Sequence, residues 1–354
     1  DLGGHFKGYG VYTDQDENGT QDVRDFDILR ETEIHFTGET TLDNGLTVGF
    51  HAESDIDNSN GDNFNNEESY AYFSGGWGRV NFGKEDGAAY LLQVAAPSAD
   101  SNIDGIRQYV QPVNYNTLFA NTGASLGVDL DGDGLTNETF GNLINASLTQ
   151  GGLDYDQDIT DRDNKISYMT PVFQGFQAGL SYTPDLDDRG LVGFLAANAA
   201  NDSRGLDGVN LDDQDGDYGD AFDVAARYEG QYDKLGFAFG AGYSTADHEG
   251  EDDLGTGTDI LDDREAYNVG LDLNYGPFGL GASYSEDNNG IDDGLAGIDD
   301  SEILVIGADY THGPYKLGAS YYDQENLSSI EDLDAERWAG GVTYTYGPGM
   351  SFRG

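Results

Sequence analysis

Two acidic segments of the chain carry carboxylates at alternate positions, a spacing that can hold a hard cation. The first segment follows the pattern D-x-D-x-N-G, and the second begins D-x-D-G-D-G. Alternating carboxylates around a tight glycine turn direct several oxygens inward, as a calcium loop requires. The candidate Ca²⁺ ligands are Asp14, Asp16, Asn18, Asp22 and Asp25 in the first segment and Asp129, Asp131 and Asp133 in the second. Since Asp-rich loops also produce such spacings by chance, an ordinary solvated surface is the alternative.

Two histidines lie among carboxylates in neighbouring segments, 28–42 and 46–55, that alternate apolar with polar residues. If Asp43–Asn44–Gly45 joins them as a hairpin, with glycine at the position of positive φ, His35 lies opposite Glu53 and the second histidine is a diagonal neighbour. The resulting patch contains Glu31, Glu33, His35, Glu39, His51, Glu53 and Asp55. Neighbouring carboxylates favour the charged imidazole, so we expect the patch to change charge in mildly acidic water. An inert polar lining is the alternative.

Recognisable catalytic motifs are missing from the sequence. It contains no nucleophile motif, no phosphate-binding loop and no cysteine. His35 and His51 are conceivable general bases, but neither has a serine in a recognisable nucleophile elbow nearby. We therefore predict no catalytic residues, no enzyme activity and no required cofactor, with Ca²⁺ as the one ion expected in the acidic loops.

Short turns alternate along the chain with much longer connections rich in Asp, Asn and Gly. Short turns at one end and long loops at the other are typical of an antiparallel barrel that spans an outer membrane. The turns are Asp43–Asn44–Gly45, Gly75–Gly76–Trp77–Gly78, Phe173–Gln174–Gly175, Tyr232–Asp233–Lys234, Gly276–Pro277, Gly313–Pro314 and Gly347–Pro348–Gly349. Aromatic residues cluster at the ends of the alternating segments, where such a barrel places its interfacial girdles.

The alternating segments predict fourteen complete strands and the start of a fifteenth. The expected ranges are 5–13, 28–42, 46–55, 67–74, 79–85, 164–171, 176–184, 221–232, 235–246, 265–275, 278–286, 302–311, 315–323 and 336–346, with a further strand beginning at Met350. Bacterial single-chain barrels have an even number of strands, so seven turns plus closure imply sixteen. We expect one all-β domain over 1–354 that lacks its last one to two strands. A natural fourteen-stranded barrel with a short tail is the alternative.

The composition suits this barrel and excludes some partners. No segment approaches the roughly 20 apolar residues of a transmembrane helix, and mean hydropathy is -0.56. In a barrel strand, apolar lipid-facing residues alternate with polar inward-facing ones, so the mean hydropathy stays low although one face is apolar. The net charge of -51 would repel nucleic acid and attract cations. The start at Asp1, without Met, suggests a mature exported form.

Several blocks of sequence resemble the general porins of alphaproteobacteria. They are residues 36–50, 78–90, 165–171 and 175–185, and the likeness extends in order over essentially the whole chain. The resemblance implies a homotrimeric, sixteen-stranded diffusion channel for small hydrophilic solutes and ions, embedded among the lipids and lipopolysaccharide of the bacterial outer membrane. It also implies that the third loop, 86–163, folds inward and narrows the pore. The unusually long acidic third and fourth loops and the absent C-terminal strands depart from the family pattern.

Strand parity and this resemblance together assign a lining to the expected pore. The resemblance suggests acidic residues on the third loop facing basic residues on the wall, and Arg107 is expected to pair with one of the loop carboxylates. The loop candidates are Glu85, Asp86, Asp100 and Asp104, and the wall candidates are Lys7, Arg79, Lys165, Arg227, Lys316 and Arg337. Net acidity predicts a preference for cations. The alternative function is an acidic, calcium-binding structural or adhesive barrel of the outer membrane.

Overall fold

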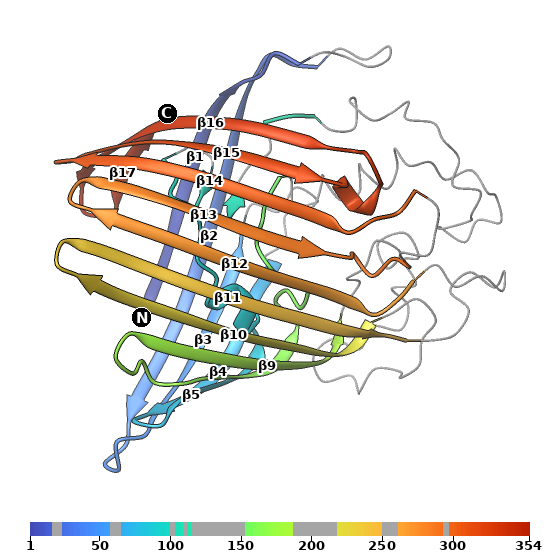
Figure 1. Cartoon of the computed structure of the whole chain (residues 1–354). Coiled ribbons are helices and arrows are strands. Elements are labelled where there is room, and N and C mark those ends of the chain that lie inside the picture. The colour runs from blue at the N-terminus through green and yellow to red at the C-terminus, as the bar shows by residue number, and fades with distance from the viewer. Residues whose placement is uncertain are drawn as a thin grey trace.

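The computed structural model describes residues 1–15, 23–56, 65–99, 103–108, 112–114, 153–186, 218–249, 261–292 and 297–354. Within these residues, fifteen strands form one antiparallel sheet in which every strand pairs with its neighbours in chain order, from β1 to β17. Figure 1 shows that this sheet curves, so that β1 and β2 lie behind the later strands. A separate two-stranded sheet, β6 with β7, lies in the connection between β5 and β8.

The strands of the large sheet are joined by short turns at one end, the turn end, and by long connections at the other, the loop end. The first half contains β1 (Leu2–Tyr12), β2 (Phe26–Thr41), β3 (Thr47–Asp55), β4 (Asn65–Gly75), β5 (Gly78–Lys84), β8 (Asn164–Met169) and β9 (Phe176–Leu186). The second half contains β10 (Tyr218–Tyr232), β11 (Leu235–His248), β12 (Arg264–Tyr275), β13 (Phe278–Asp287), β14 (Ser301–His312), β15 (Tyr315–Glu325), β16 (Ala335–Gly347) and β17 (Met350–Arg353). The remaining elements are α1 (Ala88–Leu91), β6 (Ile103–Asp104), β7 (Arg107–Gln108) and a 3₁₀ turn, Leu327–Ser329.

The sheet confirms the predicted all-β antiparallel architecture, including the short strand that begins at Met350. β17 pairs with β16, so that Arg353 lies opposite Thr343. A sixteenth strand stays a prediction. Some strands extend beyond the alternating pattern: β10 begins at Tyr218 rather than at residue 221, and its pairing with β11 shifts register between Gly219 and Phe222.

The first predicted hairpin has the expected register. Gly45 adopts a φ of +83°, and the Leu42 amide donates to the Leu46 carbonyl at 2.8 Å. Glycine suits this position because it has no Cβ to clash at positive φ. The register places His35 opposite Glu53, as predicted. This hairpin therefore also fixes which residues of β2 and β3 face the inside of the sheet.

The outer face of the sheet is apolar between its two ends. Leu180, Val224 and Leu280 are each about half exposed, with exposed fractions of 51%, 52% and 54%. Exposed aromatic residues lie near the turns, including Tyr232 and Phe278. An apolar band between aromatic girdles is the surface that a transmembrane barrel presents to lipid. Within the residues that the structure describes, no helix is long and apolar enough to cross a membrane.

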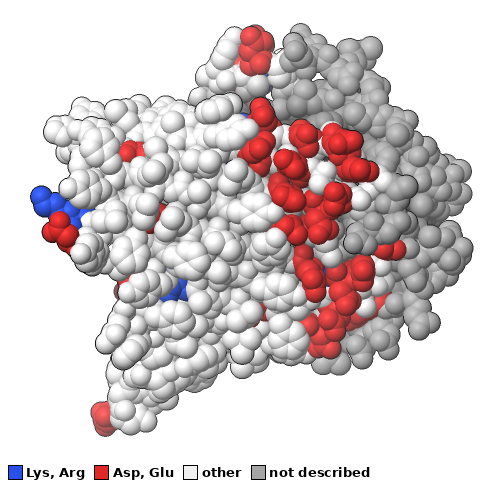
Figure 2. Space-filling view, in the orientation of Figure 1, with Lys and Arg blue, Asp and Glu red and all other residues white. Residues whose placement is uncertain are grey.

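Acidic side chains occupy a band of the outer face close to the loop end (Figure 2). Tyrosines pair with some of these carboxylates: the Tyr243 hydroxyl donates to Glu265 at 2.9 Å, and the Tyr321 hydroxyl donates to Glu336 at 3.0 Å. The charged band thus begins where the apolar band ends, so the aromatic residues between them mark the edge of the lipid-facing surface.

Candidate functional site

The connection between β5 and β8 enters the space enclosed by the curved sheet. Directly after β5 the chain turns inward, and α1 contacts β8, β9, β10 and β11. The Ala88 amide donates to the Ser181 hydroxyl on β9 at 2.8 Å, and both Ala88 and Ala89 are fully buried. The predicted inward course of the third loop is therefore confirmed for its described residues.

Glycines on the inner wall provide the seat for this loop. A Cβ atom at Gly270 would lie 2.0 Å from the Val94 carbonyl oxygen, and one at Gly307 would lie 2.0 Å from that of Pro97. Such distances are far below any van der Waals contact, so the loop backbone fits only because the wall has no side chains there. The wall glycines in close approach to the loop are Gly179, Gly240, Gly242, Gly270, Gly281, Gly307 and Gly318.

This row of glycines was not predicted, although the sequence contains a signal for it. Gly240 pairs with Gly270 across β11 and β12, and Gly281 pairs with Gly307 across β13 and β14. Glycine weakens a strand interior unless another backbone approaches it closely. Inward-facing glycines that stand opposite one another in successive strands therefore indicate the path of a crossing segment.

A buried polar network holds the returning half of the loop. Asp223 on β10 accepts hydrogen bonds from the Thr160 hydroxyl at 2.9 Å and the Ser244 hydroxyl at 2.6 Å. Gln157 donates to Ser244 and to the Ala266 carbonyl, both at 2.9 Å. Because buried polar groups are costly when unpaired, this network specifies one position of the loop against the wall.

Lys165 holds the third loop against the wall. It was predicted to line the pore, and the structure differs from that prediction. It lies on β8 and faces inward, but only 4% of it is exposed. Its Nζ donates to the carbonyl oxygen of Thr160 at 3.0 Å, and also to those of Glu85 and Asp161. The ammonium group is covered because the loop begins and returns directly over this position.

Glu85 and Asp86 are buried at the base of the loop, which differs from their predicted place among the acidic residues that face the pore constriction. Their exposed fractions are 4% and 7%. The Asn81 amide donates to Glu85 at 2.6 Å and accepts from Arg79 at 2.6 Å. Burial raises the pKa of Glu85 to about 7, and it raises the pKa of Asp86 against the opposing effect of nearby cations.

Asp100 and the side chain of Asp104 lie outside the described residues, so their predicted role at the constriction stays a prediction. The backbone of Asp104 belongs to β6 and pairs with Arg107 on β7.

Arg107 pairs with carboxylates that sequence analysis did not name. Its Nη2 lies 3.2 Å from Asp156 and 3.4 Å from Asp158, both in the returning half of the loop. Nearby carboxylates raise the pKa of Arg107 although burial opposes them, so the group is always charged. Arg162 likewise lies 3.0 Å from Glu67 on β4 and joins the loop to the wall. These partners were unpredictable because the loop must fold back before they meet.

The remaining basic residues face inward as predicted, and each has a partner. Arg227 donates to Glu229 at 2.6 Å and to the Gln93 carbonyl at 3.2 Å. Arg337 donates to the Leu153 carbonyl at 3.0 Å. Three others follow the same pattern: Lys7 lies 3.1 Å from Glu31, Lys316 lies 3.3 Å from Asp309, and the Arg79 guanidinium lies 4.1 Å from the ring centre of Tyr72.

Histidines and carboxylates alternate across the inner face of β1 to β4. His35 Nδ1 lies 2.8 Å from Glu53, which is 3.3 Å from His51 Nε2, and His51 lies 3.5 Å from Glu68. Of the predicted patch, Glu33, His35, His51 and Glu53 thus lie in one cluster, and its role in the pore stays a prediction. Glu39 accepts a hydrogen bond from Tyr72 at 2.6 Å and lies nearer the turns. Asp55 lies opposite Glu33 in the pairing of β2 and β3.

His5 belongs to this cluster and was not predicted. It lies opposite Glu33 in the pairing of β1 and β2, and its ring centre is 6.1 Å from that of His35. Lys7 was assigned to the inner face by parity, and His5 shares that parity. The same rule would therefore have found it.

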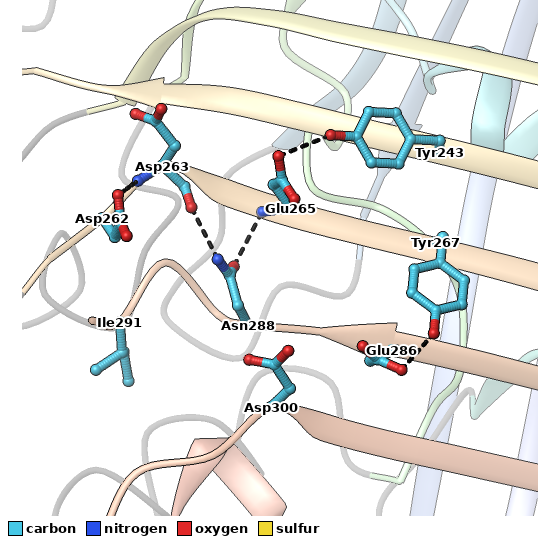
Figure 3. Close-up of a pocket in the computed structure, with 9 residues that line it drawn as sticks. All are labelled: Tyr243, Asp262, Asp263, Glu265, Tyr267, Glu286, Asn288, Ile291 and Asp300. Atoms are coloured by element: carbon cyan, nitrogen blue, oxygen red, sulfur yellow. Dashed lines mark hydrogen bonds between the residues drawn. The ribbon is translucent and has the colours of Figure 1, made fainter. Parts of the chain in front are cut away.

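A pocket of about 380 Å³ opens near the loop ends of β11 to β14 (Figure 3). Its lining is mainly acidic. The Asn288 side chain joins two strand ends there, because it donates to the Asp263 carbonyl at 2.8 Å and accepts from the Glu265 amide at 2.9 Å. The lining residues are Tyr243, Asp262, Asp263, Glu265, Tyr267, Glu286, Asn288, Ile291 and Asp300. Tyr243 and Tyr267 are exposed on the outer face, so this pocket is separate from the interior cluster.

The predicted Ca²⁺ segments fall mostly outside the described residues. Asp14 and Asp25 are described, and the Thr13 amide donates to the Asp25 carbonyl at 2.9 Å. The other candidates, Asp16, Asn18, Asp22, Asp129, Asp131 and Asp133, lie outside the described part of the chain. Calcium binding there stays a prediction.

The curved antiparallel sheet, its lipid-facing outer surface and its inward third loop define a barrel of the outer-membrane pore type. The whole chain, residues 1–354, matches the family described as Gram-negative porin, and the chain belongs to that family. It is an integral, multi-pass β-barrel of the bacterial outer membrane.

Several known proteins share parts of this sequence. An uncharacterized protein of Rickettsia conorii is 25% identical over 244 residues, which are 61% of this chain and 52% of that protein. An uncharacterized protein of Rickettsia prowazekii is 24% identical over 252 residues, with the same coverage. The chain thus spans about half the length of the curated relatives it matches.

Solved structures share the fold at low sequence identity. OmpF of Salmonella typhi, in complex with daunomycin, has a TM-score of 0.55 and 16% identity, covering 98% of this chain and 86% of its own. An anion-selective porin from Comamonas acidovorans has a TM-score of 0.53 and 20% identity, covering 98% and 85%. A mutant of the Rh. blastica porin has a TM-score of 0.51 and 15% identity, covering 100% and 92%.

Proposed function

We propose that this chain forms a passive diffusion pore for small hydrophilic solutes and ions, and that the pore prefers cations. The family and the inward third loop support the pore, and they give no support to an enzyme. The cation preference rests on one observation. Arg107 and Arg162 in the loop and Lys165 beneath it are each engaged by carboxylates or carbonyls, while the facing wall is rich in carboxylates.

The charges on that wall favour cations for an electrostatic reason. Glu31, Glu39 and Glu53 lie on β2 and β3, where their described partners are histidines, Tyr72 and Lys7, so few permanent cations offset their charge. Carboxylates that line a narrow aqueous path raise the local cation concentration and repel anions. The chain's net charge of -51 adds to this effect.

Single-channel recording in a planar bilayer tests both parts of the proposal. We expect ohmic conductance steps and, under a salt gradient, a zero-current potential with the sign of cation preference. A zero-current potential of the opposite sign would refute the cation preference and leave the pore intact. Absence of conductance from correctly folded protein would refute the pore and favour a structural or adhesive role.

We further propose a homotrimer in contact with lipopolysaccharide, with Ca²⁺ in the acidic loops. The family resemblance supports the homotrimer. The acidic band on the outer face near the loop end supports the lipid contact, because divalent cations can bridge carboxylates to anionic lipid head groups (Figure 2). Native mass spectrometry in detergent measures the number of copies, and a monomer would contradict the first proposal.

A further inference from the structure

We propose that His5, Glu33 and His35 form a binding site for a divalent transition metal of the zinc class on the inner wall. One donor atom from each residue lies within 4.8 Å of the other two. The three residues lie on β1 and β2, and the pairing of these strands places His5 directly opposite Glu33. Regular strands hold their backbones rigidly, which suits a preformed site.

The distances among the donors suit a tetrahedral ion. Glu33 Oε2 lies 3.4 Å from His5 Nδ1 and 3.4 Å from His35 Nε2. With Zn–N and Zn–O bonds of about 2.0 Å, two donors of a tetrahedral site are about 3.3 Å apart. A carboxylate shared by two imidazoles at this spacing therefore needs little movement to close around one ion. Two histidines and one carboxylate leave the fourth position open to water or solute.

The second nitrogen of each imidazole also has the partner that a metal ligand requires. His5 Nε2 lies 2.6 Å from Glu31 Oε1, and His35 Nδ1 lies 2.8 Å from Glu53 Oε2. Histidines that bind metal usually donate this second N–H to a carboxylate, which fixes the tautomer and directs the other lone pair at the ion. Here both histidines have such an arrangement.

A neighbouring combination, His35 with His51 and Glu53, is a weaker candidate. It would use His35 Nδ1 and Glu53, the pair that orients His35 for the first site. The first site has an outer carboxylate, Glu31 or Glu53, behind each of its two imidazoles. We therefore assign the ion to His5, Glu33 and His35.

Imidazole ligands distinguish this site from the predicted calcium loops. Ca²⁺ takes oxygen ligands, whereas imidazole suits Zn²⁺, Cu²⁺ and Ni²⁺. Zinc should therefore bind in the presence of excess Ca²⁺, which would occupy sites made only of carboxylates. The inference goes beyond the proposed pore and does not depend on conduction.

The test is calorimetric titration of the detergent-solubilised full chain with Zn²⁺ in excess Ca²⁺. We expect binding that His35→Gln weakens by about tenfold or more, since losing even an outer partner lowers affinity by about 10–100-fold. His312→Gln is the matched control, because this histidine lies at the turn end of β14, and it should bind as the wild type does. Absence of zinc binding by the wild type, or equal affinity of wild type and His35→Gln, would overturn the site.

A spectrum of the wild type keeps the test independent of how the variants fold. Electron paramagnetic resonance with Cu²⁺ as the probe should show hyperfine coupling to two imidazole nitrogens. Coupling to one nitrogen is expected in His5→Gln. A wild-type spectrum with oxygen ligands alone would refute the assignment.

Discussion

The carbonyl oxygen of Val94 lies only 2.0 Å from the point where a Cβ atom at position 270 would be, and Gly270 has no Cβ. The third loop and β12 are therefore packed so closely at this point that not even a methyl group fits between them. This contact shows that the position of the loop is determined by backbone packing as well as by charge.

Gly270→Ala should displace the loop from the wall. Overpacking a close contact costs typically 1–3 kcal/mol, so we expect a lower thermal unfolding temperature and a larger, noisier single-channel conductance. Gly236→Ala is the matched control, since a Cβ there meets its nearest atom at an ordinary 3.7 Å. Equal conductance in the two variants would show that the loop does not depend on this contact.

Lys165→Met should loosen both ends of the loop. The substitution removes the ammonium donor of three carbonyl oxygens, of which that of Thr160 keeps the Asp163 amide as a partner. Each buried group left unsatisfied costs about 1–3 kcal/mol. Limited proteolysis should then cut within the third loop at lower protease concentration. Lys316→Met is the control: its side chain is 39% exposed and pairs with Asp309, so its loss should cost less than about 1 kcal/mol. Unchanged proteolysis of Lys165→Met would contradict the supporting role.

The buried Glu85 should make stability depend on pH. In the folded protein its pKa is about 7, above the ordinary value of 4.5. Below pH 4.5 the carboxyl group is protonated in both the folded and the unfolded protein, whereas between pH 4.5 and about 7 it is protonated in the folded protein only. The free energy of unfolding should therefore fall between these values as pH rises. Glu85→Gln should therefore remove this pH-dependent loss of stability.

The comparison is between the wild type and Glu85→Gln in detergent, at about pH 4 and about pH 8. The variant should match the wild type at the lower pH and exceed it at the higher pH, by up to about 3 kcal/mol. A variant that gains no stability at the higher pH would contradict the raised pKa.

The acidic inner wall should set ion preference. Glu53→Gln should lower the cation-to-anion permeability ratio by about two- to fivefold, because one charge a few ångström from an ion in water is worth about 1 kcal/mol or less. The zero-current potential under a salt gradient measures this ratio. Glu336→Gln changes a carboxylate on the outer face and should leave the ratio unaltered. Equal ratios in the two variants would place the selectivity elsewhere.

Removal of calcium should lower stability if the acidic segments bind it. A chelator would release the ion and leave carboxylates such as Asp14 and Asp16 to repel one another, so the unfolding temperature should fall and recover when Ca²⁺ is restored. Differential scanning calorimetry with and without the chelator measures the change. An identical unfolding temperature would exclude structural Ca²⁺.

The sequence by itself determined the sheet and the faces of its strands. Alternation, short turns and glycine at positive φ are local properties, so they predicted the hairpin around Gly45, the pairing of His35 with Glu53 and the strand at Met350. Strand parity alone was enough to predict that Arg227 and Arg337 face inward.

Only the tertiary structure decided what the inward residues do. The third loop must first cross several strands before Lys165 meets its carbonyls, Arg107 meets Asp156, and Val94 lies against Gly270. These contacts join residues far apart in the sequence, and apart from the paired inward glycines no local pattern indicates them. Burial by that loop, which the strand pattern could not show, also turned Glu85 from an expected lining residue into a covered one.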